Sequence, residues 1–224
     1  MFARCPRSYG CGARGVVGWG ITTLDDLVAD LAWDIDRLSP RAAVAFYAAA
    51  CGALRPRSGA WASPPADELL DAALDAARAY AATGVCGPAA ADLLAAVEEE
   101  TPDADDPTPS GLAYGCWTCA DVALRTAVGA GARGGAGPGA PGAGYGVGYA
   151  LDPVISAATQ RLFGVAGLDN GPEDAAALDA VLAEPEVLAG VAVVRDAVDH
   201  LAAHPEPDPA DLDTVAALLS GLAP

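Results

Sequence analysis

The apolar positions of this chain recur every three or four residues, which is the spacing of one face of an α-helix. The run from Leu24 to Leu38 is one example, because its leucine, valine and isoleucine side chains return at that interval. No segment alternates polar residues with β-branched apolar residues, which is the pattern of a half-buried strand. The pattern therefore predicts an all-α protein without a sheet.

Proline marks the start of many of these runs. It fits the first helical turn because the N–H that it lacks would have no partner there. Together with the glycine and proline stops, these starts predict an antiparallel bundle of eight or nine helices joined by mostly short connections. The expected helices cover residues 23–38, 40–54, 67–82, 88–100, 114–128, 153–163, 173–183, 185–203 and 209–222.

Two segments fall outside this pattern. Residues 1–20 lack periodicity, so they are either disordered or an extension upstream of a true start near Val16. Residues 129–148 are rich in glycine, and they are expected to form a flexible loop. Because the runs on both sides of this loop have the same helical character, residues 21–224 are expected to form a single domain.

The charge balance is strongly acidic, with 30 Asp and Glu against 12 basic residues and a net charge of −18. Such a field repels nucleic acids and anionic membrane surfaces, and it attracts basic proteins. The alternative is a solvated acidic surface that only maintains solubility. No run is long enough to cross a bilayer or has the form of a signal peptide, so a cytoplasmic location is expected.

Two acidic stripes are the candidates for contact with a basic partner. In each stripe, aspartates repeat every four residues and so share one face of a helix, where like charges cost a little helix stability. We hypothesise that the stripes bind an Arg- and Lys-rich protein, and a solvated helix face is the alternative. The first stripe consists of Asp26, Asp30 and Asp34, and the second of Asp67, Asp71 and Asp75.

Cys116 and Cys119 form a Cys-x-x-Cys pair near the expected start of a helix. There, backbone N–H groups and the helix dipole would stabilise a thiolate and lower the pKa of the outer cysteine. Cys116 would then be a nucleophile and Cys119 its resolving thiol. All-helical peroxidase-type proteins with such a pair place a histidine four residues after the second cysteine, where this chain has Ala123. The alternative is two small thiols packed in a helix interface.

Asp196, His200 and His204 repeat every four residues, a spacing that can bind a metal. However, Pro205 biases His204 away from helical geometry, and two histidines near a helix C-terminus also interact favourably with its dipole. The Gly-x-Gly-x-x-Gly match at residues 129–134 follows a helix rather than a strand, so it does not indicate a dinucleotide site. No metal and no cofactor are therefore expected.

Three segments of the chain resemble a known family. Residues 94–124 contain an acidic helix end, a turn with proline and Ala-Asp-Asp, a Tyr-Gly step and a helix with Val-Ala-Leu. These features are similar to the middle of the bacterial domain-of-unknown-function family number 416, whose members include the YjaG-like proteins. Residues 37–56 and 184–201 are similar to its opening and penultimate helices. The resemblance implies an all-α bundle and no established activity, so no functional residues are carried over.

These observations together predict an acidic helical protein that acts by binding, without catalysis of its own. Our working hypothesis is an adaptor or immunity-like module that binds a basic protein through the two acidic stripes. The alternative is a small thiol oxidoreductase that uses Cys116 and Cys119. A homo-oligomer also remains open.

Overall fold

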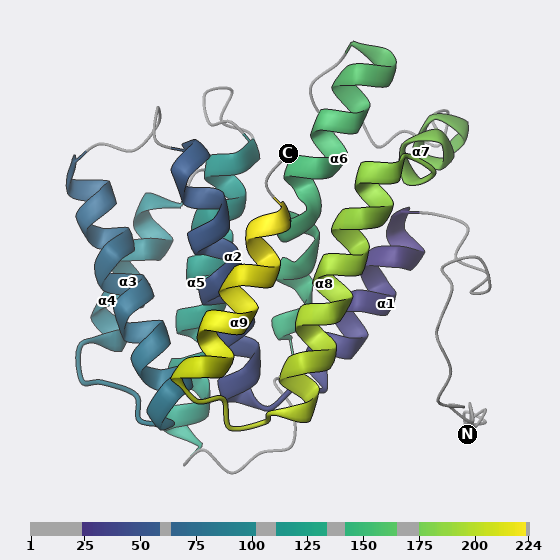
Figure 1. Cartoon of the computed structure of the whole chain (residues 1–224). Coiled ribbons are helices and arrows are strands. Elements are labelled where there is room, and N and C mark those ends of the chain that lie inside the picture. Colours follow the sequence, from purple (N-terminus) through teal and green to yellow (C-terminus); the bar gives the residue numbers. More distant parts are fainter. Residues whose placement is uncertain (1–23, 59–63, 102–110, 134–141, 165–174, 223–224) are drawn as a thin grey trace, which may run out of the picture.

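The computed structural model describes residues 24–58, 64–101, 111–133, 142–164 and 175–222 (Figure 1). Within these ranges the chain forms nine α-helices, two 3₁₀ turns and no strand, which confirms the predicted all-α class. Residues 1–20, whose disorder was predicted, lie outside the described ranges. The elements are α1 (Leu24–Asp36), α2 (Pro40–Ser58), α3 (Pro64–Thr83), α4 (Ala90–Glu100), α5 (Gly111–Ala132), η2 (Ala143–Gly146), α6 (Val147–Phe163), α7 (Ala175–Leu182), α8 (Pro185–Ala203), α9 (Pro209–Leu219) and η4 (Ser220–Leu222).

The helices pack side by side as a bundle, with α2 and α5 at its centre (Figure 1). The helices α3 and α4 lie on one side of this centre, whereas α1, α6 and α8 lie on the other. Every residue from Ala42 to Ala48 is buried, so α2 has no solvent face over that stretch. A helix that is apolar all round is a core helix, and the small alanine side chains of α2 let neighbours approach it from several directions.

Aromatic residues supply the largest buried side chains of the core. Phe46 and Tyr47 on α2 and Trp117 on α5 have no exposed surface. The Phe46 and Tyr47 rings meet edge to face with centroids 5.1 Å apart, and the Tyr47 hydroxyl donates a hydrogen bond to the carbonyl of Ala143 in η2. The core therefore joins α2, α5 and η2 directly.

The glycine-rich segment 129–148 is not a single loop, so the expected loop bounds are wrong. The helix α5 continues to Ala132, and η2 and the start of α6 occupy the other end of the segment. A Cβ atom at Gly144 would lie 2.2 Å from the carbonyl oxygen of Ala32, and one at Gly146 would lie 2.9 Å from the Tyr47 ring. The glycines at this end therefore allow η2 to pack closely against α1 and α2.

The helix starts agree with the proline pattern at some positions and not at others. The helices α2, α8 and α9 begin at Pro40, Pro185 and Pro209, as expected. In contrast, Pro153 lies inside α6 rather than at its start. The helix α3 also begins at a proline, Pro64, three residues before its expected start at residue 67. Proline therefore marks four helix starts in the described ranges and is misleading at Pro153.

Candidate functional site

The first acidic stripe lies on α1, where its second and third aspartates face α8. Arg195 of α8 donates a hydrogen bond from Nη2 to Oδ2 of Asp30 at 3.2 Å. Asp34, one turn later, lines a groove of about 340 Å³, which we call the α1–α8 groove. Asp26 is exposed. The groove is lined by Asp34, Arg37, Leu38, Ser39, Val198, Asp199, Leu201, Ala202 and Pro205.

The charges around the groove leave Asp34 in a negative environment. Partial burial raises the pKa of Asp34 above its usual range, and the carboxylates of Asp30 and Asp199 raise it further. Arg195 and Arg37 act in the opposite direction without cancelling these effects. Burial is the larger of these causes, and the effect of the two carboxylates shows in addition that negative charge prevails around Asp34. A cation that entered the groove would therefore be stabilised by Asp34 and Asp199.

The second acidic stripe lies on α3, where arginines of the same chain contact its aspartates. Arg55 of α2 forms an ion pair with Asp71, and its Nη2 lies 3.7 Å from Oδ1 of Asp67. Arg78 lies at 4.0 Å from Asp75. The hydrogen bond from Arg55 lowers the pKa of Asp71. Each aspartate of this stripe therefore already has a cation nearby.

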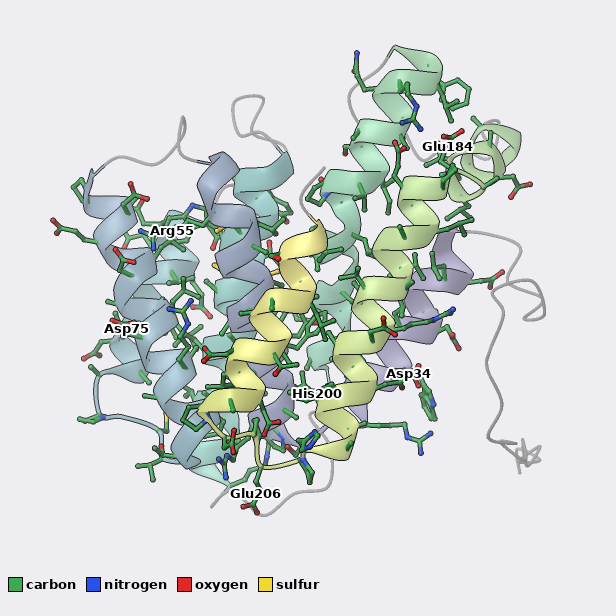
Figure 2. The ribbon with its side chains drawn as sticks, viewed as in Figure 1. Asp34, Arg55, Asp75, Glu184, His200 and Glu206 are labelled. Atoms are coloured by element: carbon green, nitrogen blue, oxygen red, sulfur yellow. The ribbon has the colours of Figure 1, made fainter. Side chains whose placement is uncertain are left out.

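The two stripes do not form one surface. In Figure 1, α1 and α3 lie at opposite sides of the bundle. Figure 2 shows Asp75 on the α3 side and Asp34 on the far side, near α8. The two stripes are therefore two separate candidate surfaces.

The Cys-x-x-Cys pair is buried inside the bundle. The expectation that it lies in the first turn of a helix is wrong, because α5 begins at Gly111 and Cys116 follows five residues later. Cys116 and Cys119 have no exposed surface, and burial raises the pKa of Cys119. Cys116 Sγ lies 3.3 Å from Sγ of Cys51 on α2, and the hydrogen bond between them raises the pKa of Cys51, as does burial. This geometry is that of packed thiols, and it does not favour the oxidoreductase alternative.

Sequence reasoning did not identify Cys51 as the neighbour of Cys116. The two residues are far apart in the chain and belong to different helices. Only the packing of α2 against α5 brings their sulfur atoms together, so no spacing in the sequence could have indicated the contact.

The two histidine side chains lie close to Asp211, and not to Asp196 as the spacing predicted. His200 Nε2 lies 3.0 Å from Oδ1 of Asp211 on α9, and the His200 and His204 ring centroids are 4.4 Å apart. Asp196 is exposed one turn earlier on α8. Asp208 and Asp211 form a capping box at the start of α9. The spacing of these two aspartates was the feature of the sequence that could have drawn attention to Asp211. Figure 2 shows His200 near the end of α8.

No protein-family model, no curated protein and no solved structure matches the chain. The resemblance to family number 416 therefore stays a prediction. Among the helices in the described ranges, none is long and apolar enough to cross a membrane.

Proposed function

We propose that the protein is a non-catalytic binding module whose α1–α8 groove receives a cationic segment of a basic partner protein. The raised pKa of Asp34 is the observation that supports this proposal most directly. It reflects partial burial first and, after it, a deficit of positive charge in a groove large enough for a side chain, about 340 Å³. An arginine or lysine of a partner would compensate this deficit.

An exposed aromatic side chain adds to the argument. Trp33 on α1 is 61 % exposed, which is unusual for so large an apolar side chain. It lies one helical turn before Arg37, which lines the groove. Tryptophan is enriched in the residues that contribute most to binding, and its ring attracts arginine and lysine cations. Trp33 and the groove together form a surface suited to a basic, arginine-containing segment.

The α3 stripe is a weaker candidate for the same role. Asp67 and Asp71 already interact with Arg55, which a partner's cation would have to displace. The gain from a new contact is therefore smaller on α3 than at Asp34. We place the partner on α1 and α8, and assign the protein an adaptor or immunity-like role in the cytoplasm.

Two triple variants test this placement, because each removes three negative charges. The first is Asp26→Asn, Asp30→Asn and Asp34→Asn, and the second is Asp67→Asn, Asp71→Asn and Asp75→Asn. The probe is a fluorescently labelled oligo-arginine peptide, and its affinity is measured by fluorescence anisotropy. We expect the α1 variant to weaken binding about tenfold or more, a loss of about 1.4 kcal/mol or more, and the α3 variant to change it only about twofold.

Two further measurements test whether peptide binding is electrostatic and whether Trp33 contributes to it. Affinity for the peptide should fall steeply as salt rises, because exposed charges are screened. Trp33→Ala should weaken binding by about 0.5–1 kcal/mol, the size of an exposed cation–π contact. Equal losses in the two triple variants would show that only net charge matters, and would contradict the proposed groove. Absence of peptide binding at low salt would contradict the proposed function itself.

A further inference from the structure

Two histidines and an aspartate come together at the junction of α8 and α9. We propose that His200, His204 and Asp211 bind one Zn²⁺ ion there. None of the three ligands lines the α1–α8 groove, although Ser39 and Pro205, which do line it, also hold the chain beside the site.

The ligand atoms are already spaced for coordination. A ring nitrogen of each histidine and a carboxylate oxygen of Asp211 all lie within 4.8 Å of one another. Asp211 Oδ1 lies 3.0 Å from His200 Nε2 and 3.8 Å from His204 Nδ1. Ligands about 2.0–2.1 Å from a tetrahedral Zn²⁺ are roughly 3.3 Å from each other. His204 Nδ1 also lies 2.8 Å from the carbonyl oxygen of His200, so a bound ion would replace this hydrogen bond. With that exchange, side-chain rotations would bring all three atoms to bonding distance.

The capping box of α9 orients the aspartate. Oδ2 of Asp211 accepts a hydrogen bond from the backbone N–H of Asp208 at 3.0 Å. Asp208 Oδ1 in turn accepts hydrogen bonds from the backbone N–H groups of Ala210 and Asp211. Oδ2 is thus held by the helix terminus, while Oδ1 faces His200. This is the kind of outer hydrogen bond that fixes a metal ligand in place.

The chain between the two helices is also held in place. Arg41 of α2 donates from Nη2 to the carbonyl of Pro207 at 3.2 Å, and Ser39 donates from its hydroxyl to the carbonyl of Pro205. Both contacts tie this connection to the beginning of the core helix α2, which Ser39 directly precedes. Because His204 and Asp211 flank the connection, they are held close together before any ion binds, which reduces the entropy cost of binding.

The donor atoms select the class of ion. Two imidazole nitrogens and one carboxylate suit Zn²⁺ and similar transition ions, whereas Ca²⁺ and Mg²⁺ prefer oxygen ligands. The sequence contains two histidines, and both belong to this cluster. Three protein ligands leave a fourth position for water or an external ligand, which is the arrangement of open zinc sites. The side chain of His204 is 47 % exposed, so that position is accessible to solvent.

The test is a ZnCl₂ titration of the full chain after chelator treatment, followed by NMR of the histidine ring nitrogens in ¹⁵N-labelled protein. With two histidines, the spectrum reports the site directly and separates it from zinc bound by thiols. We expect the ring nitrogens of both histidines to shift and to saturate at one equivalent. Ring signals that stay unchanged would overturn the proposal, even if calorimetry detected zinc bound elsewhere.

Variants then assign the ligands. His204→Ala and His200→Gln should each weaken zinc binding about tenfold or more, because each removes one of three protein ligands. Asp213→Asn is the control, since it removes an exposed carboxylate from the same helix and should change affinity less than about twofold. Affinity retained in both histidine variants would overturn the proposal. His204 is exposed, so its replacement leaves the fold intact and the result interpretable.

Discussion

Asp34 and Asp71 show that the environment of an aspartate decides whether its charge stabilises or destabilises the fold. Both belong to acidic stripes with the same spacing, yet their pKa values shift in opposite directions. Burial and neighbouring carboxylates raise the pKa of Asp34, whereas the hydrogen bond from Arg55 lowers the pKa of Asp71. Charged Asp34 therefore opposes folding, and charged Asp71 supports it.

The substitution Asp34→Asn should stabilise the protein at neutral pH. The folded-state pKa of Asp34 is raised, so its contribution to stability is present at low pH and is lost as pH rises through that value. Because the side chain is partly exposed, the gain should stay below about 1 kcal/mol, or roughly 2–4 °C in Tm. Thermal unfolding followed by circular dichroism measures the gain, which should disappear towards acid pH.

The matched variant Asp71→Asn should behave in the opposite way. The pKa of Asp71 is lowered, so its contribution is present at neutral pH and is lost as pH falls through the folded-state value. Asp71→Asn should therefore lower Tm at neutral pH and have little effect in acid. A lower Tm for Asp34→Asn at neutral pH would contradict this account of the groove.

The periodicity of the aspartates predicted their shared helix faces but not their partners. Arg195 and Asp199 reach Asp34 from α8, and Arg55 reaches Asp71 from α2. These residues lie on other helices, so their effect depends on which helices pack together. The spacing of residues within one helix contains no information about that choice.

At the scale of the elements, Pro153 shows that the local preference of proline for helix starts does not always decide where a helix begins. It has no N–H to donate to the carbonyl of Tyr149 one turn earlier, and such a position normally breaks a helix. The structure places this carbonyl oxygen 2.9 Å from where a Cβ of Gly115 would lie. The helices α5 and α6 thus meet at the irregular point. Because their packing stabilises α6 through the proline, the expected helix start at residue 153 is wrong.

The contact of η2 with α1 gives a prediction for Gly144. A Cβ in Gly144→Ala would lie 2.2 Å from the backbone oxygen of Ala32, and backbone cannot rotate away as a side chain can. The Gly144 N–H also donates to Oδ1 of Asp36 at 2.8 Å, and separating the elements would lengthen this bond. We expect a loss of about 2–4 kcal/mol in the free energy of unfolding, measured by urea denaturation.

Gly148 provides the control for this substitution. A Cβ there would lie 3.7 Å from Cγ1 of Val28, which is an ordinary contact. Because alanine is the better helix former, Gly148→Ala should leave stability unchanged or raise it by up to about 1 kcal/mol. Similar losses in both variants would show that η2 does not approach α1 closely.

At the scale of the whole molecule, arginines link helices that would otherwise repel one another. Arg125 of α5 contacts Glu98 of α4 at 2.8 Å, and Arg161 of α6 pairs with Glu184 and Glu186 at the start of α8. The sequence has only 12 basic residues for 30 acidic ones, so carboxylates remain in excess even where one arginine pairs with two of them, as Arg161 does. Repulsion among the remaining carboxylates acts on the fold as a whole.

Added salt should therefore stabilise the protein. Raising the salt concentration from about 0.01 M to about 0.1 M shortens the Debye length from about 30 Å to about 10 Å, which screens repulsion between distant carboxylates. The short ion pairs between helices are screened less. We expect Tm to rise over this range in calorimetric scans at neutral pH. A falling Tm would show that the ion pairs contribute more than the net charge of −18.

The all-α class could be predicted because helical periodicity and proline positions are local properties. The central position of α2 could not be predicted, although its sequence is visibly rich in alanine. Alanine forms helices both on surfaces and in cores, so composition alone did not separate the two cases. The meeting of Cys51 with Cys116 depends on the same packing and was missed for the same reason.

The position of α2 also affects how the protein is made. Arg41 at the start of α2 contacts Pro207, 166 residues later, and α9 covers part of the same helix. At about 5–20 residues per second, a ribosome needs roughly 10–30 s to synthesise that distance. Throughout that interval the α9-facing side of α2 lacks its cover. The residues on that side are mostly Ala45, Ala48, Ala49, Gly52 and Ala53. Such small side chains expose little apolar area, which limits aggregation of the nascent chain until its last helices are complete.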